Sequence, residues 1–94
     1  MPRAIASHIL VASEDQAIDL KARVEAGETF ADLASEHSMC PSGKSGGSLG
    51  EFGQGDMVPE FDAVIFSELP IGEVSDPVQT QFGYHLIKVD HRLG

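Results

Sequence analysis

The chain has 94 residues, a length that corresponds to one small domain. Its 15 acidic and 6 basic residues give a formal net charge of −9, which disfavours nucleic acid and anionic membrane surfaces, because both are bound by clustered Lys and Arg. The single cysteine, Cys40, excludes an internal disulfide and a zinc site built from cysteines. With 41% apolar residues the chain is expected to fold around a hydrophobic core.

The sequence contains no stretch of the ~18–20 apolar residues that a membrane-spanning helix needs. The apolar run at residues 4–11 is too short for a secretory signal, and no small-residue cleavage site follows it. We therefore expect a cytoplasmic location. A mature or excised domain with a new start methionine is the alternative.

The first forty residues predict a strand followed by two helices. Residues 4–11 alternate between two largely apolar faces, which is typical of a central strand covered on both sides. Ser13 begins a capping box and Gly27 marks the end of the first helix, while Thr29 begins a second helix that ends near His37. The residues expected to point inward are Ala17, Leu20 and Val24 in the first helix and Phe30, Leu33 and Ala34 in the second.

The second half predicts turns, a third helix and two strands. Six of the ten glycines fall between Gly43 and Gly55, a density that favours turns, with a short strand at 48–52. A third helix has Pro59 near its first position. Residues 69–72 predict a turn, residues 74–79 an edge strand interrupted by Pro77, and residues 84–91 a strong strand. This order indicates an α+β fold with a small, mostly antiparallel sheet.

Familiar binding motifs are absent from the chain. Gly43-Lys44-Ser45 lacks the earlier glycine and the preceding apolar strand of a phosphate-binding loop, so nucleotide binding is not expected. His37 and Cys40 have the spacing of metal ligands, but no second pair completes a tetrahedral site.

Four blocks of sequence resemble the parvulin-type peptidyl-prolyl cis-trans isomerases along essentially the whole chain. Any one block is weak evidence, whereas all four in order and at compact spacing are specific to this family. The blocks are residues 6–11 (ASHILV), 30–38 (FADLASEHS), 46–52 with 55–61 (GGSLGEF and GDMVPEF), and 74–78 with 80–89 (VSDPV and TQFGYHLIKV).

The resemblance implies one parvulin (FKBP-like) domain over residues 1–94, built as a four-stranded antiparallel sheet surrounded by about four helices. The fourth helix is implied near residues 41–44, where the composition alone predicts none. The implied activity is rotation about X-Pro bonds, which breaks no covalent bond and needs no cofactor.

The residues that match the family motif divide into a proline pocket and a polar set. Met57 and Phe61 are implied to line the pocket, with Phe82 as its third wall. Met57 and Phe61 are four residues apart and share one face if the helix begins by Met57.

The polar set consists of the candidate catalytic residues His8, Cys40, Thr80 and His85. The two histidines are implied to lie on neighbouring central strands and to form a hydrogen bond with each other. Thr80 is implied to orient one imidazole, and Cys40 to face the substrate carbonyl. Without the family resemblance, periodicity alone favours a purely structural role for the two histidines as polar groups of the core.

Other readings of the pocket residues stay open at this point. Met57 and Phe61 also fit ordinary core positions, and Phe82 also fits a packing group in a strand turn. His37 and His91 are interpreted as surface or helix-end residues.

Cys40 offers a choice between a nucleophile and a non-covalent group. Some parvulins have Asp at the matching position, and a carboxylate suits an electrostatic or hydrogen-bonding role, so we expect non-covalent catalysis.

Family members selective for phosphoserine or phosphothreonine carry a basic loop after the first strand, whereas the corresponding segment here, residues 12–16, is short and acidic. The sequence therefore predicts no phosphate requirement and an uncharged residue before proline.

Expected partners are proline-containing peptides and unfolded polypeptides, with no nucleic acid, membrane, metal or cofactor, and we expect a monomer. A binding module that recognises such segments without isomerising them is the main alternative. A thiol hydrolase built on Cys40 has little support, because the chain has no recognisable nucleophile motif.

Overall fold

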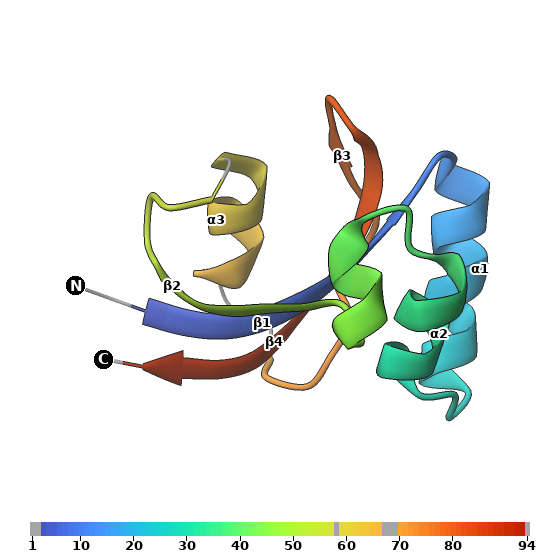
Figure 1. Ribbon diagram of the computed structural model, residues 1–94, viewed down its shortest axis with the longest axis horizontal. Coiled ribbons are helices and arrows are strands. Elements are labelled where there is room, and N and C mark those ends of the chain that lie inside the picture. The colour runs from blue at the N-terminus through green and yellow to red at the C-terminus, as the bar shows by residue number, and fades with distance from the viewer. Residues whose placement is uncertain (1–2, 58, 67–69, 94) are drawn as a thin grey trace.

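A computed structural model describes residues 3–57, 59–66 and 70–93 of the chain. Four antiparallel strands form one sheet in the order β2-β1-β4-β3 (Figure 1). The elements in chain order are β1 (Arg3–Val11), α1 (Glu14–Glu25), α2 (Phe30–His37), the 3-10 helix η1 (Pro41–Ser45), β2 (Ser48–Gly53), α3 (Pro59–Ile65), β3 (Val78–Thr80) and β4 (Gly83–Leu93). The predicted α+β class and four-stranded antiparallel sheet are confirmed.

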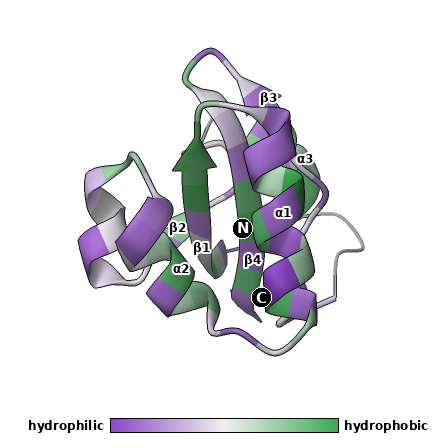
Figure 2. Ribbon diagram, turned by 90° about the vertical axis from the view of Figure 1, so that its right-hand side faces the viewer, coloured by the Kyte–Doolittle hydropathy of each residue, from purple (hydrophilic) through white to green (hydrophobic). Residues whose placement is uncertain are grey.

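Two hydrophobic cores cover opposite faces of β1 and β4, the two central strands. On one face, Ile9 and Leu86 pack with the buried residues of α1 and α2. On the other, Ala6 and Ile87 pack with Phe61 and the rest of α3. Figure 2 shows the end of β1 as a continuous hydrophobic stretch, with hydrophilic residues prominent on α1. The two faces of β1 are both apolar because the strand lies between these cores, as its sequence predicted.

The two N-terminal helices form where their caps and inward residues predict them. The Ser13 side chain accepts a hydrogen bond from the Gln16 N–H at 3.2 Å and caps α1. Gly27 follows the helix with a φ of 113°. All six residues expected to point inward contribute to the core: Ala17, Leu20, Phe30, Leu33 and Ala34 are buried, and Val24 is partly buried against them.

The edge strand predicted at residues 74–79 is confined to Val78–Thr80 in the structure, because Pro77 has no N–H to donate to the sheet. Val74 forms an isolated bridge to Lys88, and β3 begins directly after Pro77 at the edge of the sheet. The predicted turn is found at residues 70–72, where the Glu73 N–H donates to the Pro70 carbonyl at 3.2 Å. Leu69, the first residue of the predicted turn, lies outside the described residues.

Pro59 occupies the first position of α3, as predicted, and the condition for Met57 to share its helical face is not met. Helix α3 begins at Pro59, so Met57 lies in the turn before it and shares no helical face with Phe61. Proline fits the first helical position, since its missing N–H would have no partner there. The fourth helix implied by the resemblance is the 3-10 helix at Pro41–Ser45. In the part of the chain that is described, no helix has the length and apolar character to cross a bilayer.

The glycine-rich segment lies close against the centre of the sheet. The His8 N–H donates to the Gly47 carbonyl at 2.9 Å, which fixes the segment beside β1. Gly47 has a φ of 84°, and a Cβ atom there would lie 2.4 Å from the His8 carbonyl oxygen. Glycine is required at this position because any side chain would displace the backbone of His8.

Replacing Gly47 by alanine should destabilise the protein more than replacing Gly50, which also has a positive φ but has no atom near its missing Cβ. Gly50→Ala adds only left-handed backbone strain, about 1–2 kcal/mol. Gly47→Ala adds a clash with β1, and overpacking of this kind costs about 1–3 kcal/mol more. Urea unfolding of both variants measures the difference. Equal destabilisation would contradict the close approach of Gly47 to His8.

Candidate active site

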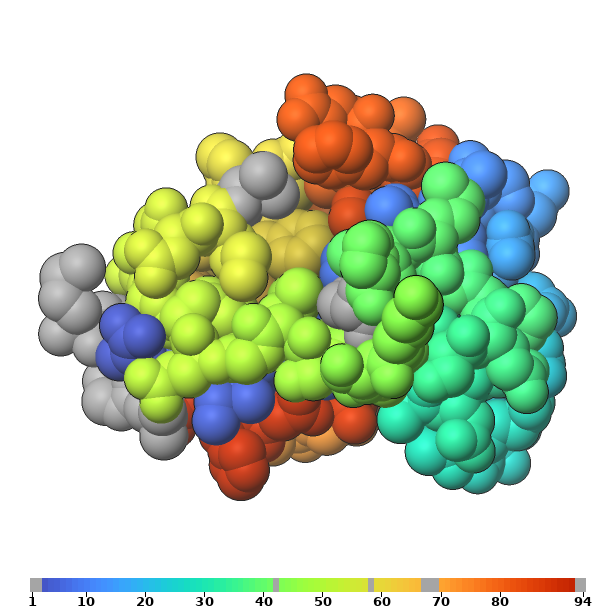
Figure 3. All heavy atoms as spheres, in the orientation of Figure 1, coloured from blue at the N-terminus to red at the C-terminus, as the bar shows by residue number. Residues whose placement is uncertain are grey.

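A pocket of about 390 Å³ opens on the face of the sheet that carries α3. Figure 3 shows the hollow between the yellow segment that leads into α3, the orange β3–β4 turn and the green residues near η1. Almost all of its accessible lining is apolar. The lining residues are His8, Leu10, Met39, Cys40, Pro41, Leu49, Met57, Phe61, Thr80, Phe82 and His85.

The pocket brings together all seven site residues that the sequence predicts. Met57 reaches the pocket from the segment before α3. Phe82 is 61% exposed in the β3–β4 turn and forms an outer wall. The roles assigned to these residues stay predictions.

A pair of buried histidines forms the base of the pocket. His8 on β1 pairs in register with Ile87, two residues from His85 on β4, so the two imidazoles are diagonal neighbours on one face. Their Nδ1 atoms lie 3.0 Å apart, and the rings are nearly parallel, with centroids 5.2 Å apart. The hydrogen bond implied by the family resemblance is therefore found.

Thr80 links the histidine pair to the β3–β4 turn. Its Oγ1 lies 2.7 Å from Nε2 of His85 and accepts a hydrogen bond from the Phe82 N–H at 3.2 Å. If the hydroxyl donates to His85 Nε2, the His85 proton is placed on Nδ1, which then donates to His8. The contact that an orienting role of Thr80 requires is therefore present, and the role itself stays a prediction.

Phe61 packs its ring against both imidazoles. It meets His8 at 5.5 Å and His85 at 4.8 Å between ring centroids, in edge-to-face geometry with interplanar angles of 68° and 81°. Such contacts favour a fixed ring position. Phe61 therefore serves both the core and the pocket, so the two interpretations of this residue are compatible.

Both imidazoles are shifted toward the neutral form. Burial, with a smaller contribution from His85, lowers the pKa of His8 from 6.5 to about 4. Burial also lowers the pKa of His85, and the carboxylate of Glu60 offsets part of that lowering. At neutral pH the base of the pocket is therefore uncharged.

Cys40 lines the pocket from the position directly before η1. Its side chain is partly exposed, and its backbone N–H donates to the Ser38 hydroxyl at 3.3 Å. Within residues 3–57, 59–66 and 70–93, no hydrogen bond joins the Cys40 sulfur to an imidazole. The described residues likewise include no group of three His, Cys, Asp or Glu side chains that could hold a metal.

Four apolar lining residues were not predicted from the sequence: Leu10, Met39, Pro41 and Leu49. Leu10 had a usable signal, because it shares a strand face with His8 in the period-two pattern. Met39, Pro41 and Leu49 lie in or beside the glycine-rich segment, where no period indicates which way a side chain points.

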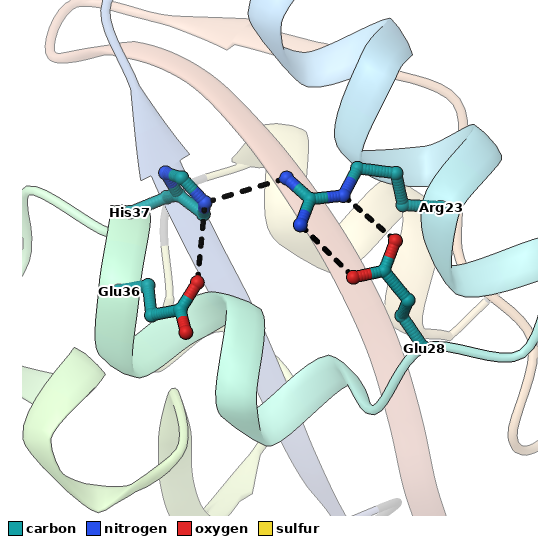
Figure 4. A network of polar contacts seen from close by, with 4 residues as sticks. All are labelled: Arg23, Glu28, Glu36 and His37. Atoms are coloured by element: carbon teal, nitrogen blue, oxygen red, sulfur yellow. Dashed lines mark hydrogen bonds and ion pairs between the residues drawn. The ribbon is translucent and has the colours of Figure 1, made fainter.

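His37, which has the spacing of a metal ligand relative to Cys40 in the sequence, does not line the pocket and is the last residue of α2. Figure 4 shows Arg23 of α1 bound through two nitrogens to both Glu28 oxygens, at 2.8 and 2.9 Å, with a third nitrogen 3.5 Å from His37. This network joins the ends of α1 and α2. His91 is exposed on β4, so both histidines fit their predicted surface or helix-end positions.

Comparison with known proteins places this fold and pocket in a family. The model of the PPIC-type peptidyl-prolyl isomerase (rotamase) domain matches residues 8–91. The foldase protein PrsA of Geobacillus kaustophilus is 52% identical over 89 residues, which cover 94% of this chain and 31% of that protein. The chain spans between about a quarter and a third of the length of such curated relatives.

Solved structures agree with this match. The crystal structure of the peptidylprolyl isomerase PrsA from Bacillus anthracis has a TM-score of 0.94 and 41% identity, covering 99% of this chain and 43% of that one. The solution structure of the parvulin of Nitrosopumilus maritimus has a TM-score of 0.84 and 40% identity, covering 95% of this chain and 96% of that one.

The low pKa of His8 predicts that stability falls as the solution is acidified from pH 6.5 to about 4. In this window the unfolded chain binds a proton at residue 8 that the folded chain excludes, so the free energy of unfolding decreases as pH falls. The expected loss from His8 is about 1–3 kcal/mol, allowing for solvent screening. Urea unfolding at several pH values measures it.

The matched variants are His8→Gln and His91→Gln, the second at an exposed histidine. His8→Gln should reduce the pH dependence of the unfolding free energy, whereas His91→Gln should leave it unchanged. An unchanged slope in His8→Gln would show that burial of His8 does not exclude the proton.

Proposed function

The chain belongs to the PPIC-type peptidyl-prolyl cis-trans isomerase family, the parvulins, and from this membership we propose that it isomerises X-Pro bonds by non-covalent stabilisation of the twisted amide. The substrates proposed are proline-containing peptides and unfolded polypeptides. The relatives include proteins named foldases, and binding of such segments is consistent with those names.

The reaction makes modest chemical demands. Amide resonance holds the C–N bond planar with a barrier of about 18–20 kcal/mol, and rotation removes that resonance without breaking a bond. An acceleration of about 10³–10⁶ requires only ~4–8 kcal/mol of selective binding to the twisted state. A shaped pocket and a few fixed hydrogen-bonding groups are sufficient to supply it.

One observation carries the proposal: an apolar pocket with an uncharged imidazole pair at its base. The planar amide has a larger charge separation than the twisted one, so an apolar, uncharged environment favours the twisted state. Burial lowers the pKa of both His8 and His85, which keeps that environment uncharged at neutral pH. We assign the proline ring to the wall formed by Met57, Phe61 and Phe82.

The position of Cys40 supports a non-covalent role. A cysteine nucleophile is activated by a base within about 2.6–3.2 Å, and in the described part of the chain the imidazoles bond to each other and to Thr80 instead. We propose that Cys40 faces the carbonyl of the residue before proline. His8 and His85 then hold the geometry of the pocket, and Thr80 acts as a positioning residue.

The residue before proline is proposed to be uncharged and apolar. If its carbonyl faces Cys40, its side chain lies near Leu10, Met39 and Pro41, which form an apolar end of the pocket. The segment after β1 contains no arginine that could bind a phosphate. It contains Glu14 and Asp15 in the first turn of α1, which would repel a phosphate group. We therefore propose that phosphoserine before proline is disfavoured.

A monomer in the cytoplasm is also proposed, on the strength of sequence alone. Analytical ultracentrifugation tests the first statement and cell fractionation the second. A pure binding module stays the alternative function, since the same pocket would hold a proline without rotating its amide.

Exchange NMR on a Leu-Pro peptide tests the function directly. We expect the protein to accelerate cis–trans exchange, and to act far less on a matched phosphoserine-Pro peptide. Met57→Ala should lower kcat/KM by about threefold to tenfold, or ~0.7–1.4 kcal/mol. The control Ile18→Ala removes an exposed side chain of α1 outside the pocket and should change nothing. Peptide line broadening without faster exchange would instead indicate a binding module.

A second prediction concerns Cys40. Because a hydroxyl or a carboxylate can keep a polar contact that a nucleophilic thiol does not need, at least one of Cys40→Ser and Cys40→Asp should retain measurable activity. The exchange assay above reports it, with circular dichroism to check folding. Complete loss in both folded variants would favour covalent catalysis.

A further inference from the structure

A second depression adjoins the proline pocket, and we propose that its Glu60 carboxylate selects substrates with a basic side chain directly after the proline. The depression has a volume of about 240 Å³ and is lined by Pro59, Glu60, Thr80, Gln81 and Phe82. The proposal rests on the proposed isomerase function. It adds a preference for the residue after proline to the preference already proposed for the residue before it.

The shared walls fix which neighbour of proline reaches the depression. Thr80 and Phe82 line both the proline pocket and the depression, whereas Met39, Cys40 and Pro41 line only the former. If the carbonyl before proline faces Cys40, the chain enters from that end. Consecutive Cα atoms lie about 3.8 Å apart, so the residue after proline leaves past Phe82, next to the depression.

Glu60 is available to bind a cation there. Its side chain is exposed, and within the described residues no ion pair or hydrogen bond engages it. The other acid in the first turn of α3, Asp62, already accepts a hydrogen bond from the Gly55 N–H at 2.8 Å. None of the residues lining the depression is basic, so Glu60 supplies its only formal charge among them.

One further electrostatic observation supports this assignment, and a second describes a general attraction that competes with it. The carboxylate of Glu60 partly offsets the lowering of the His85 pKa, so its charge is felt at the base of the proline pocket. The net charge of −9 favours the approach of cationic peptides to every part of the surface. A local preference must therefore be separated from this general attraction.

The experiment compares three peptides with the sequence Ala-Leu-Pro-Z, in which Z is Lys, Gln or Glu, by exchange NMR at low ionic strength. A partly exposed ion pair of this kind predicts kcat/KM about twofold to fivefold higher for Lys than for Gln, and lower again for Glu. The difference should shrink at about 1 M salt, where the Debye length is about 3 Å. Equal rates for Lys and Glu at low salt would overturn the proposal.

Glu60→Gln and Glu25→Gln separate a local contact from net charge. Each removes one negative charge, but Glu25 is an exposed residue of α1, on the opposite face of the sheet. Glu60→Gln should bring the Lys and Glu peptides to similar rates, whereas Glu25→Gln should preserve their order and spacing. The same loss in both variants would mean that general attraction causes the preference.

The Gln peptide distinguishes failure of this inference from failure of the proposed function. Accelerated exchange of the Gln peptide with no dependence on Z refutes the role of Glu60 and leaves the isomerase function in place. No acceleration of any of the three peptides refutes both.

Discussion

The hydrogen bond between two buried imidazoles is the interaction on which the rest of the site depends. His8 and His85 differ from the apolar residues of the core, because each ring buries polar nitrogens in the centre of the sheet. Buried polar atoms lower stability unless they form hydrogen bonds. The 3.0 Å contact between their Nδ1 atoms satisfies one nitrogen of each ring at the same time. That contact exists only while β1 and β4 keep a register in which the two residues are diagonal neighbours. Any change in the register of the central strands would therefore also change the geometry of the pocket.

The surroundings of the pair explain why this register is retained. Phe61 contacts both rings from α3, Thr80 holds His85 from the edge strand, and Gly47 brings the backbone of the glycine-rich segment against His8. Each of these contacts comes from a different part of the chain, so a shift of one strand would break several at once. The pocket is closely packed where Phe61 contacts the imidazoles and open toward Phe82, which is 61% exposed.

The sequence alone predicted most of the framework and part of the site, for identifiable physical reasons. The strands and α1 carry signals within a few neighbouring residues: alternation in residues 4–11 and a side-chain cap at Ser13. The pairing of His8 with His85 joins residues 77 positions apart, and only the family resemblance indicated it. The sequence placed Pro59 near the first position of α3, as found, so the condition under which Met57 would share a helical face with Phe61 is not met. The direction of Met39 and Leu49 depends on the path of a glycine-rich segment, which no local period encodes.

Charge is distributed in a way that suits rotation about an amide bond. Protonated imidazoles at the base of the pocket would favour the planar amide, whose charge separation is the larger. The imidazoles avoid this by being buried and neutral, and the acidic residue Glu60 lies at the rim of the pocket, where water screens its charge. Glu60 at that rim is close enough to influence His85 but is itself exposed. A carboxylate in this position acts on the side chain of the residue after proline and has little effect on the amide that rotates within the pocket. Recognition of the flanking sequence and catalysis of rotation can therefore be set by separate residues.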